Sequence, residues 1–154
     1  IKVSNQKTFS IPKTKEYLPA KKTVFNKIVG DSHFELLFAG FLHAAIDVKK
    51  FIKNYMQLNF KMTYINHEGG ISNYYPDFVV HLNNGERFIV ETKGAENLND
   101  PRKIERLKQW CEDATQSTGK IYKHLYVQQE EWDSLGITPN SFEEIIPVFK
   151  DKKK

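Results

Sequence analysis

The sequence of 154 residues lacks several features that would assign its class at once. Cys111 is the only cysteine, so there is no disulfide framework, which is typical of a reducing compartment. No apolar run reaches the length of about 20 residues that a membrane-spanning helix needs, and no signal-peptide pattern opens the sequence. Internal repeats and low-complexity tracts are missing as well. We therefore expect one cytoplasmic globular domain that does not use a membrane.

An excess of negative charge is also missing. The formal net charge is +4 and the pI is about 9.0, which is compatible with a polyanionic partner but is not specific for one. The positive charge is uneven, because seven lysines stand against Glu16 alone before Asp31, and Lys152–Lys154 end the chain. Such runs are either phosphate contacts or solvated ends.

The basic N-terminal region also carries the signals of a linker. Pro12 and Pro19 interrupt any helix there, and the segment has no clear apolar periodicity. We expect residues 1–27 to form an extended basic linker and residues 28–154 to form one domain. Because the first residue is Ile1 rather than Met, we interpret the chain as a domain excised from a larger protein.

The remaining sequence predicts an α/β fold with a mixed sheet. The first expected element is a helix capped by Asp31 or Ser32, with apolar spacing that continues to Ile52. A strand near 58–66 and two strands within 74–94 are expected to form a three-stranded meander, followed by a helix from Asp100 to Gly119, a strand over 121–128 and a short helix after Glu130. Pro101 at the first position of the second long helix is a strong start signal. That helix joins two strands, so we expect the last strand to run parallel to its predecessor.

The most informative segment runs from Tyr74 to Gly94 and contains Pro-Asp, a turn, and Glu-Thr-Lys. Residues two apart in a strand share a face, so Glu91 and Lys93 point the same way. The position of Asp77 depends on the turn. A two-residue Asn-Gly turn places Asp77 opposite Thr92 on the wrong face, whereas a three-residue Asn-Asn-Gly loop with a left-handed glycine places it opposite Glu91. Both turns are common, and the sequence does not choose between them.

Two carboxylates beside an ammonium group match the needs of metal-assisted phosphodiester hydrolysis. Mg²⁺ prefers hard oxygen ligands, often one or two carboxylates with waters and substrate phosphates. The ion lowers the pKa of bound water and neutralises phosphate charge, and an adjacent lysine orients the water. The competing interpretation is that these charges only protect a strand edge from aggregation, since such a pattern arises by chance in roughly one chain in ten.

Four sequence blocks carry a family resemblance. They are Gly-Asp-Ser-His-Phe-Glu at 30–35, Tyr-Tyr-Pro-Asp-Phe at 74–78, Val-Glu-Thr-Lys-Gly at 90–94, and Trp-Cys at 110–111. In this order they resemble the PD-(D/E)xK nuclease superfamily, and more narrowly the C-terminal endonuclease domain of the restriction (Res) subunit of type III restriction-modification enzymes. The resemblance covers about residues 21–127. It implies a restriction-endonuclease-like core, a mixed four-stranded sheet flanked by helices.

The resemblance also implies roles for individual residues. Asp77 and Glu91 would bind the metal, the carbonyl of Thr92 would complete its shell, and Lys93 would position the attacking water. Glu35 matches an additional acid that supports the metal site. The competing interpretation of Glu35 is an acid favoured by the positive end of a helix.

Three residues are weaker candidates for DNA contacts. Lys103 lies on the apolar side of the second long helix and could reach a phosphate; the competing interpretation, which we favour, is packing of its stem with an exposed head. Arg87 is either a phosphate contact or a solvated edge residue. Tyr75 alternates onto the face of Asp77 and is either a nucleotide contact or a rim aromatic. The histidines, including His81 about 13 Å along the strand from Asp77, lack metal-ligand spacing and are expected to be bystanders.

The implied function is a Mg²⁺-dependent DNA endonuclease domain acting on double-stranded DNA in the bacterial cytoplasm. The chain has no Gly-x-x-x-x-Gly-Lys-Ser/Thr loop, so ATP binding and translocation must reside in other domains, and specificity must come from them and from a methyltransferase (Mod) partner. We expect the isolated domain to bind and cut DNA weakly. The alternative is a non-catalytic nucleic-acid or protein-docking module with a nuclease-like fold.

Overall fold

The computed structural model describes residues 7–150, which form eight strands, four α-helices and one short 3-10 helix. In chain order the elements are β1 (Leu18–Pro19), β2 (Lys27–Ile28), α1 (His33–Ala44), β3 (Val48–Lys53), η2 (Met56–Leu58), β4 (Met62–Ile65), β5 (Ile71–Tyr74), β6 (Phe78–Leu82), β7 (Arg87–Lys93), α2 (Asp100–Thr118), β8 (Tyr122–Gln128), α3 (Gln129–Asp133) and α4 (Phe142–Phe149). Residues 1–6 of the expected linker and the basic end Lys152–Lys154 lie outside the described residues.

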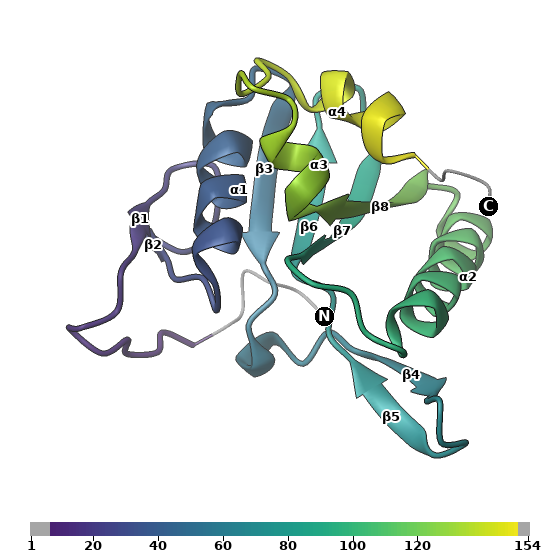
Figure 1. Cartoon of the computed structure of the whole chain (residues 1–154). Coiled ribbons are helices and arrows are strands. Elements are labelled where there is room, and N and C mark those ends of the chain that lie inside the picture. The colour runs from purple at the N-terminus through teal and green to yellow at the C-terminus, as the bar shows by residue number, and fades with distance from the viewer. Residues whose placement is uncertain (1–6, 151–154) are drawn as a thin grey trace.

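A four-stranded mixed sheet of order β3-β6-β7-β8 forms the centre of the domain (Figure 1). Strand β6 pairs antiparallel with both β3 and β7, and β7 pairs parallel with β8 through the crossover helix α2. The expected mixed four-stranded sheet flanked by helices is therefore confirmed, as is the parallel direction of the last strand.

Each face of the sheet is covered by its own apolar core. On one face, α1, α3 and α4 pack on side chains such as Phe78, Phe88 and Val90, with Phe142 of α4 fully buried. On the other face, Ile89 of β7 packs with residues of α2 and β4. Strand β7 is consequently buried on both faces, apart from its two end residues. A polar group on this strand therefore lies in a largely dry environment.

The expected long first helix is wrong beyond Ala44. The helix ends there, and residues 48–53 form β3, an edge strand of the sheet. The carboxylate of Asp47, which lies between them, accepts hydrogen bonds from the backbone N–H groups of Phe142 and Glu143 and so caps α4. Pairing with β6 outweighs the helical spacing of Val48 and Ile52, whose β-branched side chains also suit a strand.

The expected three-stranded meander is also wrong. Strand β4, within the segment expected as one strand over 58–66, pairs only with β5 in a separate two-stranded sheet. Figure 1 shows this hairpin projecting from the main sheet below α2. The strand that completes the central sheet is β3 instead.

The second long helix follows its sequence signals closely. Helix α2 begins at Asp100 with Pro101 in its first turn, and Gly119 ends it in the left-handed conformation with a φ of 66°. Asn99 rather than Asp100 is the capping residue. None of the helices within residues 7–150 is long and apolar enough to cross a membrane.

Candidate active site

The loop between β6 and β7 decides which residues can act together. The backbone N–H of Leu82 donates to the carbonyl of Glu86 at 2.9 Å, and Gly85 has a φ of 93°. The loop is thus the three-residue Asn83-Asn84-Gly85 form, with the glycine in the conformation that favours it. The ladder runs to Phe78 opposite Val90, and Asp77, the residue before β6, donates its N–H to the carbonyl of the same Val90. The three-residue loop that the chemistry requires is confirmed, and the side chain of Asp77 reaches Thr92, the neighbour of Glu91.

The chain breaks its strand just before Asp77. Strand β5 ends at Tyr74 and β6 begins at Phe78, so the expected continuous alternation through Tyr75 is wrong. Pro76, which has no N–H, lies in this break, and its carbonyl accepts a hydrogen bond from the Asn54 side chain at 2.8 Å. Because of the break, Tyr74 rather than Tyr75 reaches the site.

Tyr74 binds the first of the two carboxylates. Its hydroxyl donates to Glu91 Oε2 at 3.0 Å, and both residues are buried. Burial, followed by the charge of Glu91, raises the pKa of Tyr74 well above its usual value. The phenol therefore remains a hydrogen-bond donor and holds the Glu91 carboxylate in one orientation.

The second carboxylate, that of Asp77, accepts hydrogen bonds from a residue of β7. Asp77 Oδ2 accepts hydrogen bonds from the backbone N–H of Thr92 at 2.8 Å and from the Thr92 hydroxyl at 2.7 Å. The backbone of Asp77 is fixed as well, because its N–H donates to Val90 and its carbonyl accepts from the N–H of Asn54. Thr92 thus positions Asp77 through its own N–H and hydroxyl.

A third acid reaches the same place from α1. Ser32 caps the helix by accepting the Glu35 N–H, and the Glu35 side chain turns inward, leaving the residue 9% exposed. Its carboxylate lies 2.6 Å from the ammonium of Lys53, which is also 3.6 Å from Asp77 and 3.4 Å from Asp31. Burial and the charge of Asp77 raise the pKa of Glu35.

Lys53 is the residue that the sequence interpretation missed. Its side chain is only 2% exposed, although its ammonium faces three carboxylates. Burial by itself would lower the pKa of Lys53, but the charges of Asp77 and Glu35 outweigh it and the pKa is raised. A buried lysine stays charged when carboxylates surround it. Lys53 lies at the end of β3, and the helix expected there gave no reason to place it beside Asp77.

Lys93 and Lys103 lie on the Glu91 side of the site and share one partner. Lys93 Nζ is 3.4 Å from Asp100 Oδ2, and Lys103 Nζ is 3.5 Å from Asp100 Oδ1. Asp100 is 2% exposed and also accepts the backbone N–H of Asn97. The charges of Lys103 and Lys93 partly offset the rise in the pKa of Glu91 that burial and the charge of Asp77 cause. The structure therefore brings Lys103 to the site together with Lys93.

Arg87 is not part of this arrangement. It begins β7, four residues before Glu91, and its guanidinium donates to the carbonyl of Gly85 at 2.9 Å. Four residues of strand span about 13 Å, so Arg87 lies at the opposite end of the sheet.

Glu91 carries the most perturbed carboxyl group of the site. Burial is the largest cause, and the negative charge of Asp77 adds to it, so that the pKa of Glu91 rises to about 8. Carboxylates that crowd each other in a dry setting form a place where a cation is stabilised. We name Tyr74, Asp77, Glu91, Thr92 and Lys93 the Asp77 site.

The donor set of the Asp77 site fits a hard divalent cation. Among residues 7–150, no group of three or more His, Cys, Asp or Glu side chains is placed to hold a metal ion. The oxygen ligands that the Asp77 site could offer are the carboxylates of Asp77 and Glu91, together with a backbone carbonyl such as that of Thr92. Mg²⁺ is commonly held by one or two carboxylates, with water and substrate phosphate completing its shell.

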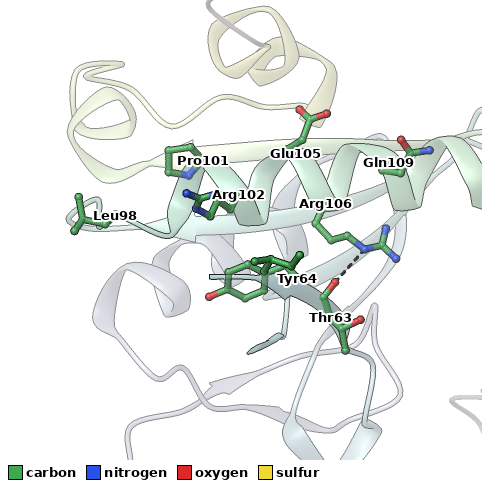
Figure 2. Close-up of a pocket in the computed structure, with 9 residues that line it drawn as sticks. Thr63, Tyr64, Leu98, Pro101, Arg102, Glu105, Arg106 and Gln109 are labelled. Atoms are coloured by element: carbon green, nitrogen blue, oxygen red, sulfur yellow. Dashed lines mark hydrogen bonds between the residues drawn. The ribbon is translucent and has the colours of Figure 1, made fainter. Parts of the chain in front are cut away.

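A separate surface groove lies between α2 and the β4–β5 hairpin. Figure 2 shows Arg102, Glu105 and Arg106 of α2 on one side of it and Tyr64 of β4 on the other. Arg106 Nε donates to the carbonyl of Thr63 at 3.1 Å and so ties the hairpin to the helix. The groove contains none of the residues of the Asp77 site, and we assign its contacts to packing of the hairpin.

Replacing Glu91 by Gln is expected to change how stability depends on pH. The folded pKa of about 8 exceeds the usual 4.5, so the folded protein keeps a proton that the unfolded chain releases. This proton contributes at most about 5 kcal/mol to the free energy of unfolding. The contribution is complete below pH 4.5 and is lost as the pH rises to about 8. A glutamine side chain cannot ionise, so the melting temperature of Glu91→Gln should exceed that of the wild type at pH 9 and approach it at pH 4.

The measurement is calorimetric unfolding without divalent metal from pH 4 to pH 9. Glu112→Gln, at an exposed position of α2, is the matched control and should follow the wild type throughout. Parallel pH profiles for the wild type and Glu91→Gln would contradict the raised pKa.

Comparison with known proteins agrees with this geometry. Residues 21–129, well over half of the chain, match the family described as Endonuclease domain. Searches of curated proteins and of solved structures gave no match. The matched region contains β3, β6, β7, α2 and β8 in full, and it includes every residue of the Asp77 site. The chain therefore belongs to the Endonuclease domain family and is a nuclease domain with a restriction-endonuclease-like fold.

Proposed function

We propose that this nuclease domain is a Mg²⁺-dependent endodeoxyribonuclease of the PD-(D/E)xK type. The observation that carries the proposal is the pairing of β6 with β7, which brings Asp77, the residue before β6, to Thr92 beside Glu91, with Lys93 two residues beyond Glu91 on its face. Two carboxylates near the ends of neighbouring strands, followed by a lysine, provide the charges that phosphodiester hydrolysis needs.

Asp77 and Glu91 would hold Mg²⁺, with the carbonyl of Thr92 as a further ligand. The ion, when bound, supplies Lewis acidity toward the water and the phosphate oxygens. Thr92 fixes Asp77 through two hydrogen bonds, and Tyr74 fixes Glu91 through one. The two carboxylates are thus preorganised, so that little reorganisation is needed during the reaction.

Lys93 orients the attacking water and offsets negative charge on the phosphate. The water oxygen bonds to phosphorus, the bond from phosphorus to one ester oxygen breaks, the water gives up a proton, and the leaving oxygen takes one up. Lys93 is held at 3.4 Å by the buried Asp100, which keeps its ammonium near Glu91. Lys103 adds a second positive charge on the same side, in reach of a substrate phosphate.

We further propose that the domain belongs to the Res subunit of a type III restriction-modification enzyme in the bacterial cytoplasm. The four sequence blocks support this context, and all of them fall between residues 30 and 111, within the matched region. The substrate would be double-stranded DNA, delivered by an ATP-driven motor in other domains and selected with a methyltransferase (Mod) subunit.

The test is cleavage of supercoiled plasmid DNA with enzyme in excess over plasmid, with Mg²⁺ or with EDTA. Lys93→Ala is expected to lower the Mg²⁺-dependent rate by about 100-fold, since a positioned proton-handling group typically contributes about 10²–10⁴-fold. Lys108→Ala, an exposed position of α2, is the control and should cleave like the wild type.

One observation favours the alternative of a non-catalytic nucleic-acid or docking module. The ammonium of Lys93 is already paired with Asp100, and that of Lys53 with Glu35 and Asp77. In such a module these ion pairs would serve stability alone. If the wild type and Lys93→Ala cleave plasmid at the same rate, with Mg²⁺ or with EDTA, the result would support that alternative and contradict the catalytic proposal.

A further inference from the structure

A groove of strongly positive character lies on the sheet beside β3. Its cationic lining consists of Lys21, Lys22, Lys49, Lys50 and Arg87, with His81 among them. None of the lining residues from the described chain is an aspartate or glutamate. We name these six residues the basic groove. The floor between them is apolar and includes Ile52 and Val79.

An irregularity in β3 places two neighbouring lysines in this groove. Val48 pairs with Leu82 and Lys50 pairs with His81, so Lys49 is an extra residue in the strand. Successive residues of a regular strand point to opposite faces, whereas a bulge re-aims a side chain. Both Lys49 and Lys50 are exposed and both line the groove. The bulge thus concentrates positive charge that a regular strand would divide between two faces.

A second segment closes the other side of the groove. The backbone N–H of Phe51 donates to the carbonyl of Lys22 at 2.8 Å, which fixes the segment of residues 21–24 along the outer edge of β3. The Lys22 ammonium itself donates to the carbonyl of Ala45 at 2.5 Å. Lys21 is exposed and remains available on the rim.

The groove lies on the same face of the sheet as the Asp77 site. Ile52 pairs with Val79, and Val79 pairs with Ile89, so these three side chains share a face with Glu91, two residues beyond Ile89. Val79 is two residues from Asp77, about 7 Å along the strand, and His81 is about 13 Å from it. Phosphates of one DNA strand are about 3.4 Å apart along the helix axis, so the distance of about 13 Å from Asp77 to His81 corresponds to about four phosphates.

The charges in the groove act on its histidine. Burial lowers the pKa of His81, and the positive charges of Arg87, Lys50, Lys49 and Lys120 lower it further. A group that is harder to protonate because of surrounding cations reports a locally positive potential. The same potential attracts a polyanion.

We propose that the basic groove binds the phosphate backbone of duplex DNA next to the phosphate that is cleaved. The proposal deepens the proposed function and rests on it, because it assigns the groove to the substrate of the Asp77 site. The groove offers point charges along an apolar floor, which suits backbone contacts that do not depend on sequence. Arg87 lies away from the Asp77 site, and in this proposal it contacts a phosphate of the same DNA further along the groove.

The test is binding of a short fluorescein-labelled DNA duplex, followed by anisotropy in EDTA at several salt concentrations. Each phosphate contact contributes about 0.9 to the slope of log affinity against log salt. The double variant Lys49→Ala/Lys50→Ala should therefore show a slope smaller by about 1.8. Between about 50 and 200 mM salt it should lose about 12-fold less affinity than the wild type.

The matched control is Lys61→Ala/Lys108→Ala, which removes the same charge from two exposed positions outside the groove. Its slope should equal that of the wild type. An unchanged slope in Lys49→Ala/Lys50→Ala, or the same change in both double variants, would overturn the proposal. Tighter binding of anionic vesicles or of RNA than of duplex DNA would overturn it too.

Binding in EDTA does not depend on hydrolysis, so the two proposals can fail separately. Loss of cleavage in Lys93→Ala, together with the reduced salt slope in Lys49→Ala/Lys50→Ala, supports both. A wild type that shows the groove-dependent slope but no Mg²⁺-dependent cleavage would contradict the proposed reaction and leave the groove as a nucleic-acid site.

Discussion

Replacing Asp77 by Asn is expected to reduce Mg²⁺-dependent DNA cleavage by at least about 100-fold without unfolding the domain. Loss of one preorganised electrostatic group costs about 10²–10³-fold in rate. The asparagine side chain keeps the size of the aspartate and an oxygen that accepts from Thr92, but it lacks the charge that a divalent cation needs. The charge of Asp77 also raises the pKa of both Glu35 and Glu91. The substitution relieves this repulsion but also takes one carboxylate from the buried Lys53 ammonium, which keeps Glu35 at 2.6 Å. We therefore expect the domain to stay folded, with a melting temperature near that of the wild type.

The measurement is the single-turnover rate of plasmid cleavage, with the melting temperature determined on the same preparation. Asp113→Asn is the matched control, because Asp113 is exposed on α2 and its side chain accepts a hydrogen bond from Gln109 on the same helix. It should cleave at the wild-type rate. An Asp77→Asn variant that cleaves as fast as the wild type would remove Asp77 from the reaction.

Replacing Lys53 by Met is expected to destabilise the domain by about 3–5 kcal/mol, the usual loss when one partner of a buried ion pair is removed. Methionine matches the length of the lysine stem, so the packing is largely kept. The ammonium, however, lies 2.6 Å from Glu35 and 3.6 Å from Asp77, and without it these carboxylates face each other. Both would then have to be protonated or hydrated.

The measurement is urea unfolding of the wild type, Lys53→Met, Glu35→Gln and the double variant. Adding Glu35→Gln to Lys53→Met should restore part of the stability, because it removes one of the opposed charges. Lys61→Met, at an exposed position, should be within about 0.5 kcal/mol of the wild type. Full stability of Lys53→Met would show that the Lys53 ammonium does not balance these acids.

Elements whose limits are set by local chemistry could be predicted from the sequence. Pro101 and Gly119 mark the beginning and end of α2 because a fixed φ suits a first turn and a positive φ suits a last one. The sequence allows a two-residue or a three-residue turn at Asn83-Asn84-Gly85, and the structure has the three-residue form that the chemistry requires. Once that loop is known, strand pairing up to Phe78 brings Asp77 to the end of β7 that carries Glu91 and Lys93.

Elements that depend on distant partners could not be predicted. Val48 and Ile52 have helical spacing with the preceding helix, and only their pairing with β6 makes the segment a strand. Because β3 was missed, Lys53 could not be placed beside the acids of the site. Strand alternation assigns Tyr75 to the face of the site, but the strand is interrupted before Asp77 and Tyr74 is the tyrosine that bonds to Glu91. The basic groove likewise depends on the bulge at Lys49 in β3, which no local sequence pattern predicts.

The most direct test of the account is a titration of Mn²⁺, as a stand-in for Mg²⁺, into the wild type and Asp77→Asn, with free Mn²⁺ measured by electron paramagnetic resonance. The account predicts a saturable site in the wild type that is lost in Asp77→Asn and is kept in Asp113→Asn. Equal Mn²⁺ binding by the wild type and Asp77→Asn would contradict the claim that Asp77 and Glu91 share a divalent cation.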